Sequence, residues 1–141
     1  MTPYSKIYNI ALGKITDYDL VNFPEDELET MLHSWLVSAI SRFTRPTSDL
    51  SQRDDELRTF LIDLEDYEQE VLALLMVVAW IEPRVNSTLL TNQFVGGKEE
   101  KYYSQAQHLQ TLMALRDSCA NNAKKLVRDN SYRSTNSYFT D

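Results

Sequence analysis

The 141-residue chain is poor in cysteine, histidine and glycine, and each shortage excludes a class of structure. A single cysteine, Cys119, can form neither an intramolecular disulfide nor a cysteine cage for a metal ion. The two histidines, His33 and His108, lack an acidic residue three positions earlier, so neither fits the Glu-x-x-His motif of di-metal helical bundles. Three glycines allow few turns with positive φ, which favours long helices joined by short connections.

Positive charge and long apolar runs are also scarce. Lys and Arg number 14 against 21 Asp and Glu, which gives a net charge of −7. This balance argues against wrapping nucleic acid, because Lys and Arg must neutralise the phosphates. No apolar run approaches the roughly 20 residues that span a bilayer. The N-terminus has neither the basic start nor the apolar core of a signal peptide. We therefore expect synthesis in a cytoplasm and no membrane partner.

Motifs for catalysis or cofactor binding are missing as well. The acidic clusters at residues 54–56 and 63–68 lack the spaced ligands and turn glycine of a calcium loop, and solvated helix ends explain them better. Gly96-Gly97 leads into KEEK and not into the Lys-Ser/Thr of a phosphate-binding loop. We predict no catalytic residue, no cofactor, no metal ion and no enzymatic activity.

The most informative positive feature is a run of eleven apolar residues, VLALLMVVAWI, at positions 71–81. A helix that is apolar on every side must be surrounded by other elements. We predict that it forms the central helix of an all-α domain, over residues 64–94. Pro83 removes one backbone hydrogen bond and clashes with the preceding turn, which predicts a kink or break near residues 79–82.

Amphipathic spacing predicts further helices around this one. They cover residues 4–14, 24–45 (stopped by Pro46), 54–61 (burying Leu57, Phe60 and Leu61) and 102–129. Asp63 is the predicted N-cap of the central helix, and Tyr18 and Phe23 are expected to pin the loop at residues 15–23. The predicted fold is a bundle of four to five helices, with residues 1–129 as the helical domain and residues 130–141 as an extended C-terminal tail.

The tail is rich in Ser, Thr and Asn, and alone it cannot bury enough surface to offset its chain entropy. Its aromatic residues are expected to anchor it on a partner surface. Helix capping is the simpler explanation for the basic residues beside it. The alternative is an interface that meets an acidic neighbour or a phosphate. The candidate interface residues are Tyr132, Arg133, Tyr138, Phe139, Lys124, Lys125 and Arg128.

The order of four sequence blocks resembles a known family. SAISRF is followed by DLSQRDDELRTFLIDL, EVLALLMVVAWIEPRVNSTLLTNQF and YYSQAQHLQTLMALRD. Over residues 4–129 the chain is similar to the small all-α head–tail connector proteins, also called neck or adaptor proteins, of tailed bacteriophages. The family implies a structural virion protein, made in the host bacterial cytoplasm, that forms a homo-oligomeric ring in the neck. Its implied partners are the portal and tail or other neck proteins, and genomic DNA passes through the ring without specific binding.

Two alternatives stay open. The first is a small acidic regulatory or inhibitory protein that binds a basic partner or mimics the charge of DNA. The second is a metal-dependent enzyme. For the connector hypothesis, we expect the tail and residues 96–101 to become ordered when subunits join, with Tyr132, Tyr138 and Phe139 inserting into a neighbour.

Overall fold

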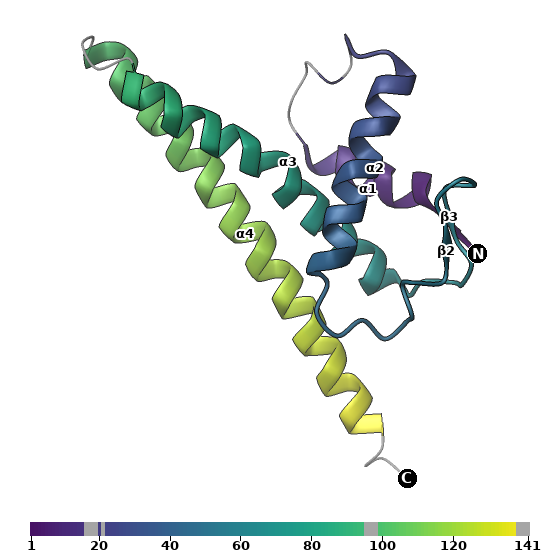
Figure 1. Cartoon of the computed structure of the whole chain (residues 1–141). Coiled ribbons are helices and arrows are strands. Elements are labelled where there is room, and N and C mark those ends of the chain that lie inside the picture. The colour runs from purple at the N-terminus through teal and green to yellow at the C-terminus, as the bar shows by residue number, and fades with distance from the viewer. Residues whose placement is uncertain (16–19, 21, 95–98, 138–141) are drawn as a thin grey trace.

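A computed structural model describes residues 1–15, 20, 22–94 and 99–137, of which 88–94, 99–105 and 134–137 are described by their backbone alone. These residues form four helices and one small sheet (Figure 1). The helices are α1 (Tyr4–Lys14), α2 (Glu25–Arg42), α3 (Asp66–Phe94) and α4 (Glu99–Ser137), and the strands are β1 (Thr2–Pro3), β2 (Arg53–Asp54) and β3 (Thr59–Phe60). The chain is therefore mostly helical, as expected, with a sheet that was not predicted. Among the described residues, no helix is both long enough and apolar enough to span a bilayer.

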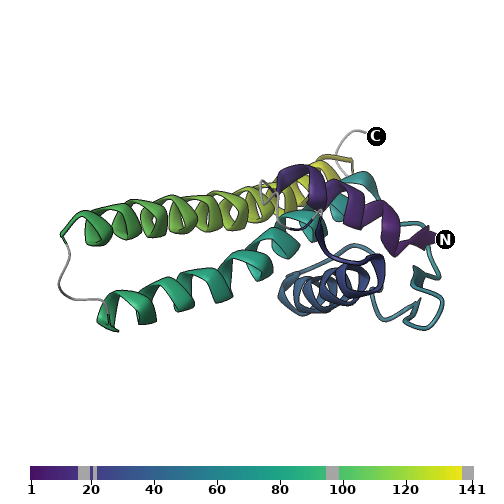
Figure 2. The same ribbon diagram turned by 90° about the horizontal axis from the view of Figure 1, so that it is seen from above.

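Helix α3 lies at the centre of the fold. All eleven residues of the apolar run at 71–81 are buried, and Leu72, Met76 and Ile81 are fully inaccessible. Helices α1, α2 and α4 each pack against α3, while α1 and α2 contact each other little (Figure 2). The prediction of a central apolar helix is confirmed.

Pro83 does not break α3, which continues to Phe94, so of the predicted kink or break the break is wrong. Packing on both sides of the proline holds the helix together. Ile81 and Val85 are buried against the core, and the Arg84 guanidinium stacks 4.6 Å from the Trp80 ring centroid. The Arg84 side chain also donates a hydrogen bond to the Trp80 carbonyl. These contacts offset the backbone bond that Pro83 cannot make.

The predicted short helix at residues 54–61 is a β-hairpin. Strand β3 pairs antiparallel with both β1 and β2, in the order β1-β3-β2. The Asp54 side chain accepts the N–H groups of Glu56 and Leu57, which favours a turn over a helix. Arg58 follows with a positive φ of 53°. Phe60 is buried as expected, but Leu57 is 71% exposed and Leu61 is 44% exposed, contrary to the prediction.

The start of α3 also differs from the prediction that Asp63 caps it. The helix begins at Asp66, and Asp63 contacts the amino group of Met1. Glu68, in the first turn, reaches back and accepts the Glu65 N–H at 3.1 Å. This contact is one half of a capping box, in which a side chain of the first helical turn accepts the backbone N–H of the residue before the helix.

Helix α4 continues through Ser137, so the prediction of an extended tail from Asn130 is wrong for residues 130–137. No glycine or proline interrupts this stretch, and extending a formed helix gains about one hydrogen bond per residue fixed. The 39 residues of α4 correspond to a rod of about 58 Å. The start of α4 and the end of α3 project from the body as a two-helix arm (Figures 1 and 2). Tyr18, Gly96-Gly97, Tyr138 and Phe139 lie outside the described residues.

Candidate interaction site

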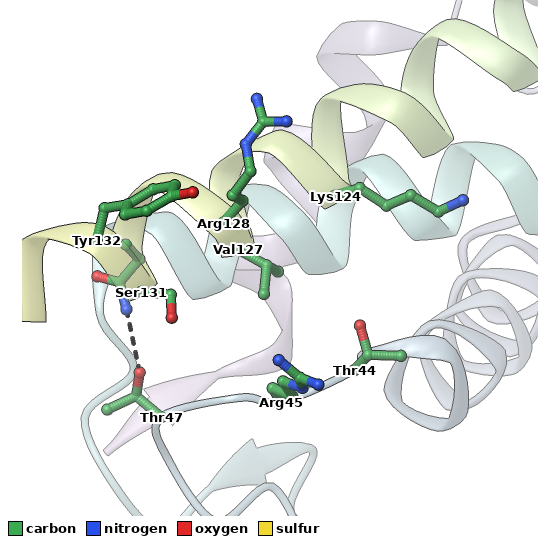
Figure 3. A pocket seen from close by; sticks show the side chains of 9 residues that line it. Thr44, Arg45, Thr47, Lys124, Val127, Arg128, Ser131 and Tyr132 are labelled. Atoms are coloured by element: carbon green, nitrogen blue, oxygen red, sulfur yellow. Dashed lines mark hydrogen bonds between the residues drawn. The ribbon is translucent and has the colours of Figure 1, made fainter. Parts of the chain in front are cut away.

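The C-terminal part of α4 and the loop after α2 enclose an open pocket of about 770 Å³. Its walls come from segments about 80 residues apart in the sequence, which face each other in Figure 3. It is lined by Thr44, Arg45, Thr47, Lys124, Val127, Arg128, Asn130, Ser131 and Tyr132.

The loop wall of the pocket is fixed to the start of α3 through Glu68. This carboxylate is fully buried and accepts the Ser48 N–H at 3.0 Å and the Ser48 hydroxyl at 2.7 Å. Helix α2 ends before this loop, and Arg45 has a positive φ of 58° directly before Pro46. A residue before proline avoids the helical region, so the loop must leave the axis of α2 here. Arg45 lies on this loop, on the wall of the pocket opposite α4 (Figure 3).

The helix wall follows from the spacing of residues on α4. Lys124, Arg128 and Tyr132 are four residues apart and therefore lie on one face. Ala123 is buried against the core, which orients this part of the helix. Asn130 donates a hydrogen bond to the Thr47 hydroxyl at 3.3 Å and so joins the two walls (Figure 3).

The pocket is positively charged although the protein is strongly acidic. Arg45, Lys124 and Arg128 all line it, and Arg128 forms a long ion pair with Asp129, at 3.9 Å. The charged ends do not converge on one point: Lys124 runs along α4, away from Arg128, and the Arg128 guanidinium points away from the loop (Figure 3). A broad acidic surface therefore fits this arrangement better than one small anion.

The structure brings only part of the predicted interface together. Lys124, Arg128 and Tyr132 line the pocket, and Tyr132 is 65% exposed. Lys125 and Arg133 are exposed on α4 but do not line it. The contributions of Thr44, Arg45 and Thr47 were missed. In the sequence Arg45 fits the cationic end of α2, and nothing local indicates that it meets a residue 80 positions away.

A second polar cluster, which the sequence did not reveal, joins the hairpin to α1 and α2. The Tyr4 hydroxyl donates to Asp55 at 2.6 Å, and this hydrogen bond lowers the pKa of the Asp55 carboxyl. Burial raises the pKa of the Tyr4 phenol. The Arg58 guanidinium pairs with Glu29 at 3.2 Å, and the Tyr4 ring stacks on His33. Because these side chains bind one another, the cluster holds the hairpin to α1 and α2, and we call it the clamp.

The predicted acidic clusters do not form a metal site in the part of the chain that the structure describes. There, no three His, Cys, Asp or Glu side chains come together in a way that could hold an ion. Asp54 stabilises the hairpin turn and Glu68 is buried under the loop after α2. Cys119 is buried, and this burial raises the pKa of its thiol.

Comparisons of this chain with protein-family models, curated proteins and solved structures give no match. The resemblance to phage connector proteins therefore stays a prediction.

Proposed function

We propose that this protein is a structural component of the neck of a tailed bacteriophage. Identical subunits form a ring that sits between portal and tail and continues the DNA channel. The observation that supports this best is the combination of a long, one-sidedly packed α4 with a cationic pocket at its C-terminal part. Both features suit contact between proteins.

The interior of the body favours a structural role. Most side chains around α3 are aliphatic or aromatic, and the one buried carboxylate among the described residues, that of Glu68, accepts hydrogen bonds from backbone and Ser48 donors. A core of this kind stabilises the fold. Recognition would then occur on the surface, at the pocket.

The shape of the molecule favours repeated contacts. The two-helix arm projects beyond α1 and α2, so its sides are available to a neighbour (Figure 1). A closed ring requires heterologous contacts, in which two different surfaces of one subunit meet the complementary surfaces of its neighbours. A net charge of −7 suits a channel that DNA must cross without adhering.

The test is assembly with the portal protein from the same genome. Native mass spectrometry and negative-stain electron microscopy of the full chain, alone and with portal, should show closed rings seated on the portal. A chain that stays monomeric and does not bind portal contradicts the proposal. Tight binding to a basic protein, displaced by DNA, would favour the acidic inhibitor instead.

Truncation after Asp129 provides a second test. It removes Asn130, Ser131 and Tyr132 from the pocket and leaves the core residues in place. The truncated protein should keep its helical circular dichroism spectrum and fail to join the ring. Infectious, tailed particles made with the truncated protein would contradict the proposed role of this segment.

A further inference from the structure

The start of α2 presents an acidic surface whose charge is complementary to that of the pocket. Glu25, Asp26 and Glu27 occupy the first turn and are exposed. Phe23, just before them, is 42% exposed. A shallow groove of about 390 Å³ is lined by Phe23, Asp26, Glu27, Thr30 and Met31. Within the described residues, none of the three carboxylates has an ion-pair partner.

The two complementary surfaces lie at opposite ends of one helix. Helix α2 has 18 residues, which corresponds to about 27 Å, and the pocket begins at Thr44 and Arg45 just after its end. Figure 1 shows the start of α2 at the far end of the body from the C-terminal part of α4. Ion pairs need a separation of about 4 Å or less, so one chain cannot join its own two surfaces.

We infer that the acidic start of α2 in one copy docks into the basic pocket of the next copy. The carboxylates of Asp26 and Glu27 face Lys124 and Arg128, and the exposed Phe23 ring lies against Tyr132. The contact joins two different surfaces, so it repeats from copy to copy. That these repeated contacts close into a ring rests on the proposed function.

A second copy fits the pocket better than a free phosphate does. The three cations are spread over two walls and point in different directions, so separate carboxylates on a protein surface can meet them where one compact anion cannot (Figure 3). Each surface also includes one exposed aromatic ring, Phe23 on one and Tyr132 on the other. Aromatic residues are enriched in protein–protein interfaces.

Charge reversal in the full chain tests this contact. The double variants D26K/E27K and K124E/R128E should each weaken self-association about tenfold or more, because two attractions become repulsions. The quadruple variant, with both surfaces reversed, should restore it. The matched controls are D66K, in the exposed first turn of α3, and K125E, which is next to Lys124 but does not line the pocket. Both controls should associate like the wild type.

Sedimentation equilibrium gives the association constants, and circular dichroism confirms that each variant is folded. Double variants that form rings as well as the wild type would overturn the inference and leave the ring proposal standing. A quadruple variant that stays dissociated would overturn the pairing of these two surfaces, as would a wild type that is monomeric at every concentration. Charge-dependent association without portal binding would support the contact and contradict the neck function.

Discussion

Replacing Glu68 by alanine tests how the loop wall of the pocket is held. The carboxylate is fully buried and accepts three hydrogen bonds, two from Ser48 and one from the Glu65 N–H. A hydrogen bond to a charged group contributes about 1.5–3 kcal/mol. The three are not additive, since Ser48 is only half-buried and water can replace part of the loss. We expect Glu68→Ala to lower the free energy of unfolding by about 3 kcal/mol.

Two further variants separate the contributions. In Glu68→Gln the amide oxygen, placed where Oε1 lies, keeps the bonds from the Ser48 hydroxyl and the Glu65 N–H. The amide NH₂ then faces the Ser48 N–H, donor against donor. We expect a loss of about 1–2 kcal/mol for this variant and about 1 kcal/mol for Ser48→Ala, which removes one hydroxyl donor.

Urea unfolding, followed by circular dichroism at 222 nm, measures these differences. For a slope of about 1–3 kcal/mol per molar urea, the Glu68→Ala midpoint should fall by about 1–3 M. Glu65→Ala is the control, because Glu65 contributes its backbone N–H to the network, and it should change stability by about 0.5 kcal/mol or less. A Glu68→Ala variant as stable as this control, or a Ser48→Ala variant less stable than Glu68→Ala, would show that the Glu68 carboxylate does not hold the loop.

Three other predictions concern the core, the clamp and the thiol. Met76→Ala, at a fully buried position of α3, should lower the free energy of unfolding by about 2–5 kcal/mol, and a loss below 1 kcal/mol in urea unfolding would contradict the central position of α3. Because the folded-state pKa of Asp55 is lowered, the stability that this carboxylate contributes is present above its ordinary pKa of about 3.9 and is lost as the pH falls through the folded value. Asp55→Asn and Tyr4→Phe should therefore both make the free energy of unfolding less dependent on pH in the acid range. An acid range unchanged in both variants would contradict the bond between these two side chains. Cys119, with its buried thiol and raised pKa, should react with iodoacetamide at neutral pH far more slowly in the folded protein than in urea, and equal rates would contradict its burial.

Local patterns correctly predicted the elements whose apolar residues follow a simple rule. Helix α1 has the predicted bounds, α2 begins one residue after the predicted start at Pro24 but ends at Arg42 instead of Arg45, and the run at 71–81 is buried at the centre. In each case the periodicity of apolar residues or a proline at the first turn is a property of neighbouring residues, so the sequence is sufficient.

Other elements were decided by groups distant in the sequence. Residues 53–60 contain helix-compatible apolar spacing, yet β3 pairs with β1 at the start of the chain and Tyr4 bonds to Asp55. Pro83 stays within α3 because packing holds both sides of it. The polar stretch from Asn130 continues α4, where the bond from Asn130 to Thr47 joins it to a distant loop.

The candidate site shows the same division. The sequence predicted that Lys124 and Arg128 lie on one helix, where their spacing of four residues puts them on one face, but it placed Tyr132 in an extended tail; only the structure continues α4 to this residue. Only the tertiary structure decided that Arg45 completes the pocket. Its position depends on where α2 ends and on the buried carboxylate of Glu68 that fixes the following loop. Helical periodicity acts over a few residues, whereas this meeting results from the packing of α2 and α4 on α3.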